Sequence, residues 1–309
     1  MSEKYLTSNG VRLAYEAFGD PGNPSIILVM GLGTQLLGWP ESMCTSLASK
    51  GFHVVRYDNR DIGLSEKMEN AHVPQAAGLM FRSRLNLPMQ VPYTLTDMAN
   101  DLMGLMDALE IPKAHLVGAS MGGMIGQIAA AKYGHRFLSF TSIMSSSGAP
   151  GLPGASREVT TTMVKRSLGL EPPTLESSMA FWRKIGSPAY QPTDEVLKQK
   201  ILASYRRSFH PEGYSRHLAA IIANGSRVRL LKKISVPTLV IHGKDDALVP
   251  VECGIDTARH IPHARLKLFE GMGHDLPEPL LPAFVKLITE HAYSASHAPA
   301  GPYPASRTA

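Results

Sequence analysis

Short apolar segments alternate with longer amphipathic segments along most of the chain. Residues 11–17 alternate apolar and polar side chains, which is typical of a strand with one buried face. Residues 25–30 form a continuous apolar run, as expected of a strand that is buried on both faces of a sheet. Similar short runs predict further strands at residues 53–57, 114–117, 138–144, 238–242 and 266–269.

Apolar residues at helical spacing occupy the intervals between these runs. They predict helices at residues 41–49, 95–109, 251–259 and 280–291, and a further helix that ends near Tyr133. Thr96 is the expected cap of the helix at residues 95–109. Strands and helices that alternate in this order indicate an α/β protein with a mainly parallel sheet and helices on both of its faces.

The pattern of apolar segments changes after residue 144. Between residues 145 and 234, glycines and prolines separate helical pieces, and the alternation of strands and helices stops. We therefore expect a core formed by residues 1–147 and 229–293, with a helical cap at residues 148–228 inserted after the sixth strand. The proline-rich residues 294–309 are expected to form a disordered tail.

Composition places the chain among soluble globular proteins. It has 309 residues, of which 44% are hydrophobic and 18% charged, and its net charge is +5. The basic side chains are dispersed and not interleaved with aromatic ones, so no nucleic-acid partner is expected. The N-terminal residues lack a signal-peptide pattern and no clean run of about 20 apolar residues predicts a membrane span, so the expected location is cytoplasmic. Cys44 and Cys253 lack metal-site spacing, and we expect neither a metal nor a cofactor.

The segment Gly118-Ala119-Ser120-Met121-Gly122-Gly123 carries the most specific chemical signal. It follows the apolar run 114–117 and opens a helical stretch, and this order of strand, glycine-flanked serine and helix is the context of a nucleophile elbow. Small neighbours allow a serine to sit on a sharp turn, beside the N-terminal N–H groups of the helix. The glycines at positions 118, 122 and 126 would also suit a helix interface in a membrane, but polar residues such as Gln127 interrupt the apolar stretch.

An aspartate and a histidine follow two later strands. Asp245-Asp246 comes after the strand predicted at residues 238–242, and His274 after the strand predicted at residues 266–269. Loops that follow parallel strands meet at the carboxyl edge of the sheet, so these side chains can converge with Ser120. A serine hydroxyl needs a base to accept its proton, and that base needs an acceptor to orient it. The order Ser, Asp, His therefore predicts a catalytic triad.

These motifs, together with residues 30–33, 57–65, 242–250 and 271–274, resemble the α/β-hydrolase fold family over about residues 5–292. Within that family the chain is similar to the aclacinomycin methylesterase group, on residues 29–31, 37–40 and 55–58. The resemblance implies an eight-stranded sheet and hydrolysis of a carboxylic ester through an acyl-enzyme. It also aligns Asp246, four residues before Pro250, with the acid of the triad.

The resemblance further implies that the backbone N–H groups of Leu32 and Met121 form the oxyanion hole. Most relatives carry His-Gly where this chain has Met30-Gly31. Because both donors belong to the backbone, the change of side chain leaves the expected hole in place. It does remove a side chain that could support the hole by hydrogen bonding.

Several alternatives to ester hydrolysis fit parts of the sequence. Thioesterases, lactonases, carbon–carbon bond hydrolases and perhydrolases use the same triad. Residues 31–36 after a strand, with Asp58 at the end of the next one, resemble a dinucleotide-binding fingerprint, but Leu36 stands where its third glycine belongs. A non-catalytic binding module is a third possibility, although decayed hydrolases usually lose a triad member and this chain keeps all three.

The expected partner is a small-molecule ester, small to medium in size and apolar. Aromatic and methionine side chains in the predicted cap favour an apolar pocket. They are Met163, Met179, Phe181, Trp182, Tyr190, Tyr205 and Phe209.

Overall fold

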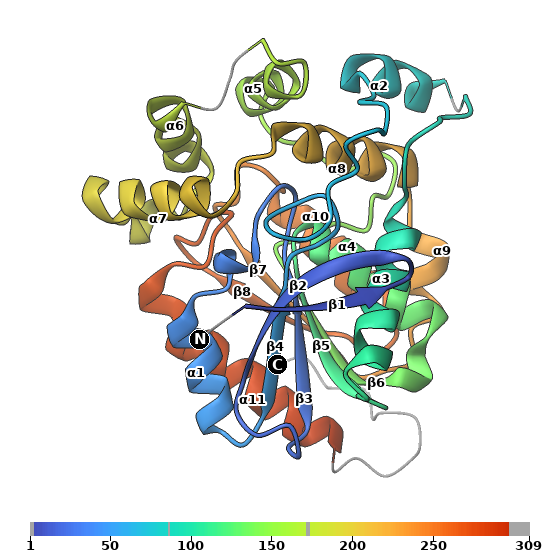
Figure 1. Cartoon of the computed structure of the whole chain (residues 1–309), viewed down its shortest axis with the longest axis vertical. Helices are drawn as coiled ribbons and strands as arrows, with labels where there is room; N and C mark the ends of the chain where they lie inside the picture. The colour runs from blue at the N-terminus through green and yellow to red at the C-terminus, as the bar shows by residue number, and fades with distance from the viewer. Residues whose placement is uncertain (1–2, 86, 171–173, 297–309) are drawn as a thin grey trace.

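The computed structural model describes residues 3–85, 87–170 and 174–296, and Figure 1 shows its arrangement. Eight strands form one sheet in the order β1-β2-β4-β3-β5-β6-β7-β8. β2 pairs antiparallel with β1 and β4, and all other neighbours are parallel. The strands are Lys4–Ser8 (β1), Val11–Phe18 (β2), Ser25–Val29 (β3), His53–Tyr57 (β4), Ala114–Ala119 (β5), Phe137–Ile143 (β6), Thr238–Gly243 (β7) and Arg265–Phe269 (β8). The prediction of a mostly parallel eight-stranded sheet is confirmed.

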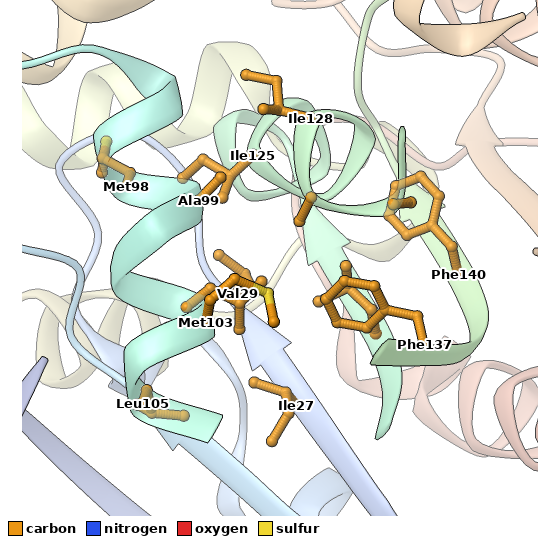
Figure 2. Packing of buried hydrophobic residues seen from close by; sticks show 14 of the residues in the cluster. Ile27, Val29, Met98, Ala99, Met103, Leu105, Ile125, Ile128, Phe137 and Phe140 are labelled. Carbon is orange, nitrogen blue, oxygen red and sulfur yellow. The ribbon is translucent and has the colours of Figure 1, made fainter. Parts of the chain in front are cut away.

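Helices cover both faces of this sheet, and β3 shows why. Its side chains alternate between two apolar clusters: Ile26 and Leu28 pack with α1 (Glu41–Ser49) and α11 (Leu281–Ser296). Ile27 and Val29 pack with α3 (Leu95–Ala108) and α4 (Met121–Lys132), as Figure 2 shows. A strand that is buried on both faces is apolar along nearly its whole length, as residues 26–30 are.

Four longer helices occupy the interval between β6 and β7, and we call them the cap helices. They are α5 (Arg157–Ser167), α6 (Leu175–Ile185), α7 (Asp194–Arg207) and α8 (Pro211–Asn224). They lie together at one end of the molecule, next to α2 (Ala76–Arg84) (Figure 1). Their place in the chain is that of the predicted insertion, while the division into domains at residues 148 and 228 stays a prediction.

The remaining helices complete the core. α9 (Val228–Leu231) and α10 (Val251–His260) flank β7 in the chain. Short 3₁₀ helices are Leu36–Gly38 (η1), Gly134–Arg136 (η2), Pro188–Tyr190 (η3) and Glu278–Leu280 (η4).

No helix in residues 3–85, 87–170 or 174–296 is long and apolar enough to cross a membrane. Cys44 and Cys253 are both buried as free thiols.

Two expectations need correction, and two elements were not predicted. The N-cap of α3 is Thr94, not Thr96, because the Thr94 hydroxyl accepts from the Asp97 N–H while the Asp97 carboxylate accepts from the Thr94 N–H. α11 extends to Ser296, so residues 294–296 are helical and not part of a disordered tail. The rest of the predicted tail lies outside the described residues. β1 and α2 were not among the elements that the apolar pattern predicted.

Candidate active site

Ser120 lies on a strained turn between β5 and α4. Its backbone φ of 54° and ψ of −119° fall in a region that side-chain-bearing residues rarely adopt. The turn is compact because the residues two positions before and after the serine are glycines. A Cβ at Gly118 would lie 2.3 Å from the Gly122 carbonyl oxygen, and one at Gly122 would lie 2.0 Å from the Val29 carbonyl oxygen. The glycines are therefore required by the turn.

The side chains of Ser120, His274 and Asp246 form one line of hydrogen bonds. The Ser120 Oγ lies 2.9 Å from His274 Nε2, and His274 Nδ1 lies 2.7 Å from Asp246 Oδ2. Ser120 follows β5, His274 follows β8 and Asp246 follows β7. These strands belong to the parallel part of the sheet, where the order is β5-β6-β7-β8. The structure thus brings together the three side chains that the sequence predicts as a triad.

The carboxylate of Asp246 is buried and held in its ionised form. Its Oδ1 accepts hydrogen bonds from the backbone N–H groups of Leu248, at 3.0 Å, and Val249, at 2.8 Å. Burial raises the pKa of Asp246, but the charge of His274 and hydrogen bonds from His242, His274 and Val249 outweigh it and lower the pKa to about 2. A carboxylate that stays charged can stabilise a cationic imidazole beside it.

The loop that carries His274 is braced by the end of α6. The His274 N–H donates to the Ile185 carbonyl oxygen at 2.7 Å, and the Gly273 N–H donates to the Ser187 Oγ at 2.9 Å. The Ser187 hydroxyl in turn donates to the carboxylate of Asp275. The cap helices therefore help to position the histidine, a role that the sequence analysis did not anticipate.

One predicted oxyanion donor belongs to the elbow, and the other belongs to the loop that passes beside it. Met121 is the first residue of α4, so its N–H is among those that a helix leaves without an intrahelical partner. Leu32 lies in the loop that follows β3, next to Gly31. A Cβ at Gly31 would be 3.1 Å from the Ser120 Cβ and 3.6 Å from its Oγ, so this loop passes directly beside the serine.

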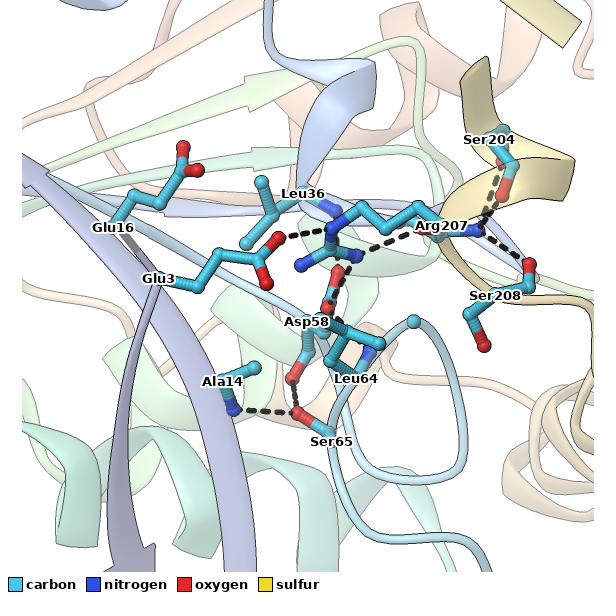
Figure 3. A network of polar contacts seen from close by, with 12 residues as sticks. Glu3, Ala14, Glu16, Leu36, Asp58, Leu64, Ser65, Ser204, Arg207 and Ser208 are labelled. Atoms are coloured by element: carbon cyan, nitrogen blue, oxygen red, sulfur yellow. Dashed lines mark hydrogen bonds and ion pairs between the residues drawn. The ribbon is translucent and has the colours of Figure 1, made fainter. Parts of the chain in front are cut away.

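Asp58 holds the loops after β3 and β4 together. Its carboxylate accepts hydrogen bonds from the backbone N–H groups of Leu36, at 2.7 Å, and Leu64, at 2.8 Å. Arg207, the last residue of α7, forms an ion pair with it at 2.7 Å and also binds Glu3 (Figure 3). Asp58 is fully buried by these contacts, and a 3₁₀ helix follows the glycine loop. The geometry contradicts a dinucleotide site, which needs this carboxylate free for a ribose.

Some of the aromatic side chains expected in a substrate pocket bind other cap residues instead. The Arg166 guanidinium stacks over the Phe181 ring, with its Cζ 4.6 Å from the centre of the ring. Tyr205 hydrogen-bonds Ser178 at 2.6 Å and packs edge-on against Phe209, which is 54% exposed. Phe181 and Tyr205 thus connect α6 to α5 and α7, while Phe209 packs on α7 from the loop that follows it.

Comparison with known proteins is consistent with this geometry. A family model described as alpha/beta hydrolase fold matches residues 24–169. The chain is 28% identical to rhodomycin D methylesterase DauP of a Streptomyces species, over 92% of this chain and 97% of that protein. It is 26% identical to 3-oxoadipate enol-lactonase 2 of Acinetobacter baylyi, over 86% of this chain and 87% of that protein.

A solved structure gives the same result at the level of the fold. The enol-lactonase from Burkholderia xenovorans superposes on this chain with a TM-score of 0.74 and 25% sequence identity. The alignment covers 94% of this chain and 100% of that one, so the likeness includes the cap helices as well as the sheet.

Proposed function

Because the chain belongs to the α/β-hydrolase fold family, we propose that it is a serine hydrolase that cleaves a carboxylic ester. Ser120 is the proposed nucleophile, His274 the general base and Asp246 the acid that orients the base. The observation that carries the proposal is the unbroken line of hydrogen bonds from Ser120 Oγ through the imidazole of His274 to Asp246. A serine hydroxyl becomes a competent nucleophile when a base can remove its proton as it attacks.

The proposed reaction has two halves. Ser120 Oγ attacks the ester carbonyl carbon while His274 Nε2 takes the hydroxyl proton, and the carbonyl π electrons move onto the oxygen. The tetrahedral intermediate collapses to an acyl-enzyme, and the imidazolium gives its proton to the departing alcohol. A water molecule, deprotonated by the same imidazole, then attacks the acyl carbon. The bond from that carbon to Ser120 Oγ breaks, the imidazolium returns its proton to Oγ, and the acid is released. Asp246 stays ionised throughout and stabilises the imidazolium.

The charge that develops on the substrate oxygen also needs donors. We assign this role to the backbone N–H groups of Leu32 and Met121, the second at the N-terminus of α4. Preorganised donors of this kind each contribute about 10²–10³ in kcat. A glycine at position 31 lets the loop after β3 approach the nucleophile, since a Cβ there would lie 3.1 Å from the Ser120 Cβ, closer than an ordinary contact.

The names of the relatives support an ester as the substrate class. One is a methylesterase and another an enol-lactonase, and both names describe cleavage of an acyl–oxygen bond. We therefore propose a small-molecule carboxylic ester as the substrate, with lactones as the second candidate.

The proposed location is the cytoplasm. The free thiols of Cys44 and Cys253 support a reducing compartment of this kind.

A panel of chromogenic esters of increasing acyl length, with one lactone included, tests the proposal. The wild-type protein should hydrolyse at least one ester with saturation kinetics. Ser120→Ala should lose this turnover while its melting temperature stays within a few degrees of wild type. Turnover retained by Ser120→Ala contradicts the proposed mechanism, and hydrolysis of the lactone alone selects the second candidate.

A further inference from the structure

One histidine of α8 links the loop after β3, which passes beside Ser120, to the loop after β4. His217 is fully buried, and its Nδ1 lies 3.3 Å from the backbone nitrogen of Gly33 in the loop after β3. Its Nε2 lies 2.8 Å from the carbonyl oxygen of Arg60 in the loop after β4. A single imidazole from a cap helix therefore contacts the loop that contains Leu32.

The two contacts define the protonation state of the His217 ring. A carbonyl oxygen can only accept a hydrogen bond, so Nε2 must carry the proton that goes to Arg60. Nδ1 of the neutral ring is then an acceptor, and it receives the Gly33 N–H. Burial lowers the pKa of His217 to about 4, which favours this neutral form near pH 7.

The Gly33 N–H belongs to a peptide group that is held at both ends. Residues 31–34 form a turn in which the Thr34 N–H donates to the Gly31 carbonyl oxygen at 3.3 Å. Gly33 occupies the third position with a φ of +63°, as a type II turn requires. The Thr34 hydroxyl donates to the Leu32 carbonyl oxygen at 3.2 Å. Thr34 thus fixes the C=O of the Leu32–Gly33 peptide, and His217 fixes its N–H.

A second side chain of α8 packs on the same glycine. A Cβ at Gly33 would lie 2.5 Å from the Tyr214 Cδ2, so the ring covers the glycine directly. Tyr214 and His217 are three residues apart in α8, and residues at this spacing share one face of a helix. The face of α8 that meets the loop therefore supplies both packing and a hydrogen-bond acceptor.

We propose that His217 is a positioning residue for the oxyanion hole, because it fixes the turn that presents the Leu32 N–H. The inference rests on the proposed function, since an oxyanion forms only if the chain performs acyl transfer. In this arrangement a cap helix supplies the hydrogen-bonding support that the side chain of Met30 cannot give. The fixed orientation of a donor matters because preorganisation is the source of oxyanion stabilisation.

Two amide variants of His217 separate positioning from bulk structure. The side-chain oxygen of Asn can reach the position of Nδ1 and accept the Gly33 N–H, whereas the longer Gln amide reaches the position of Nε2 and binds Arg60. His217→Leu removes both contacts. His115→Leu is the matched control, because His115 is equally buried, bonds Ser139 at 2.9 Å and lies near the far end of β5 from Ser120.

The readouts are kcat and KM on the best ester, and affinity for a boronic acid that mimics the tetrahedral intermediate. We expect His217→Leu and His217→Gln to lower kcat by about 10- to 100-fold, less than loss of a donor itself. KM should change less than about threefold, and boronate affinity should fall in parallel with kcat. His217→Asn should retain at least about five times the kcat of His217→Gln, and His115→Leu should match wild type.

Several results overturn the inference. One is equal kcat in His217→Asn and His217→Gln, a comparison that remains available if His217→Leu does not fold. Others are a loss confined to KM and a loss of similar size in His115→Leu. These results differ from a failure of the proposed function. In that case the wild-type protein would show no Ser120-dependent ester turnover at all.

Discussion

Asp245 and Asp246 are neighbours in the chain, yet their carboxylates bind different parts of the histidine loop. Asp246 is buried, and its Oδ2 lies 2.7 Å from His274 Nδ1. Asp245 is exposed, and its Oδ2 accepts the backbone N–H of Gly271 at 2.8 Å. Adjacent residues in an extended loop face opposite ways, which explains why only one of them can reach the imidazole.

This difference predicts unequal effects of two conservative variants. Asp246→Asn should lower kcat at least a hundredfold, because an uncharged amide neither fixes the tautomer of His274 nor stabilises its cation. The equivalent change in a serine protease costs about 10⁴. Asp245→Asn should cost less than about tenfold. Steady-state kinetics of both variants on one ester measures the two losses of kcat. The reverse ranking would mean that Asp245 is the acid of the triad.

Stability should fall as the pH drops from about 6.5 towards 4. Burial lowers the pKa of His115, His217 and His291 from 6.5 to about 4 in each case. The unfolded chain therefore binds protons at a higher pH than the folded one, and each histidine removes up to about 3 kcal/mol from the free energy of unfolding.

Urea unfolding at several pH values between 4.5 and 7.5 measures this dependence. His115→Gln should flatten it, because one of the three buried rings is gone. His135→Gln should reproduce the wild-type dependence, since His135 is exposed on the surface. A wild-type free energy of unfolding that is constant over this range would contradict the prediction.

The elbow should tolerate no side chain at Gly122. An added Cβ would lie 2.0 Å from the Val29 carbonyl oxygen, a backbone atom that cannot move without displacing β3. Gly122→Ala should therefore destabilise the protein by at least about 3 kcal/mol, which is the upper end of the usual range for single substitutions.

Gly78→Ala is the matched control for this substitution. Gly78 lies exposed within α2, and a Cβ there meets nothing within 4 Å. It should be neutral or stabilising by up to about 1 kcal/mol, because alanine favours a helix. Thermal unfolding of both variants provides the comparison. Equal effects at the two positions would show that steric crowding at the elbow does not control stability.

A buried ion pair should make α8 essential for stability. Arg216 of α8 contacts both carboxylate oxygens of Asp61, at 2.5 and 2.9 Å, and both side chains are buried. Burial raises the pKa of Asp61, but hydrogen bonds from Arg216, Met68 and Tyr93 outweigh it and hold the pKa below its ordinary value.

Removing one partner of such a pair is expected to be worse than removing both charges. Arg216→Met should cost about 3–5 kcal/mol, because it leaves an uncompensated buried carboxylate. Adding Asp61→Asn should recover part of that loss. Urea unfolding of the single and double variants measures it, and a double variant that is less stable than Arg216→Met would contradict this account.

The triad could be predicted from the sequence because each member belongs to a local pattern. Ser120 stands in a glycine-flanked turn between a strand and a helix, and Asp246 and His274 each follow an apolar strand. Parallel strands present such loops at one edge, so strand order alone was enough to bring the residues together. The bracing residues Ile185 and His217 could not be found in this way. Their contacts depend on how the cap helices dock, and no local pattern encodes that.

Two short sequence patterns do encode features that the apolar pattern does not predict, the cap of α3 and the strand β1. Thr94 is followed three residues later by Asp97, which is the spacing of a capping box, whereas Thr96 lacks such a partner. Asn9-Gly10 lies between β1 and β2, and both residues have positive φ. Asn-Gly favours the two-residue turn of a hairpin, and this turn pairs β1, whose side chains are largely exposed, with its neighbour.

Covalent labelling tests the central claim most directly, since only an activated serine reacts rapidly with a fluorophosphonate. The wild-type protein should gain the mass of one phosphonyl group, and peptide mapping should place it on Ser120. His274→Ala should slow the labelling by at least about a hundredfold, because the hydroxyl loses its base. Stoichiometric labelling of Ser120 in the wild type, with none in Ser120→Ala, is the result we predict. An unlabelled wild-type protein, or a label on another residue, would contradict the assignment of Ser120 as the nucleophile.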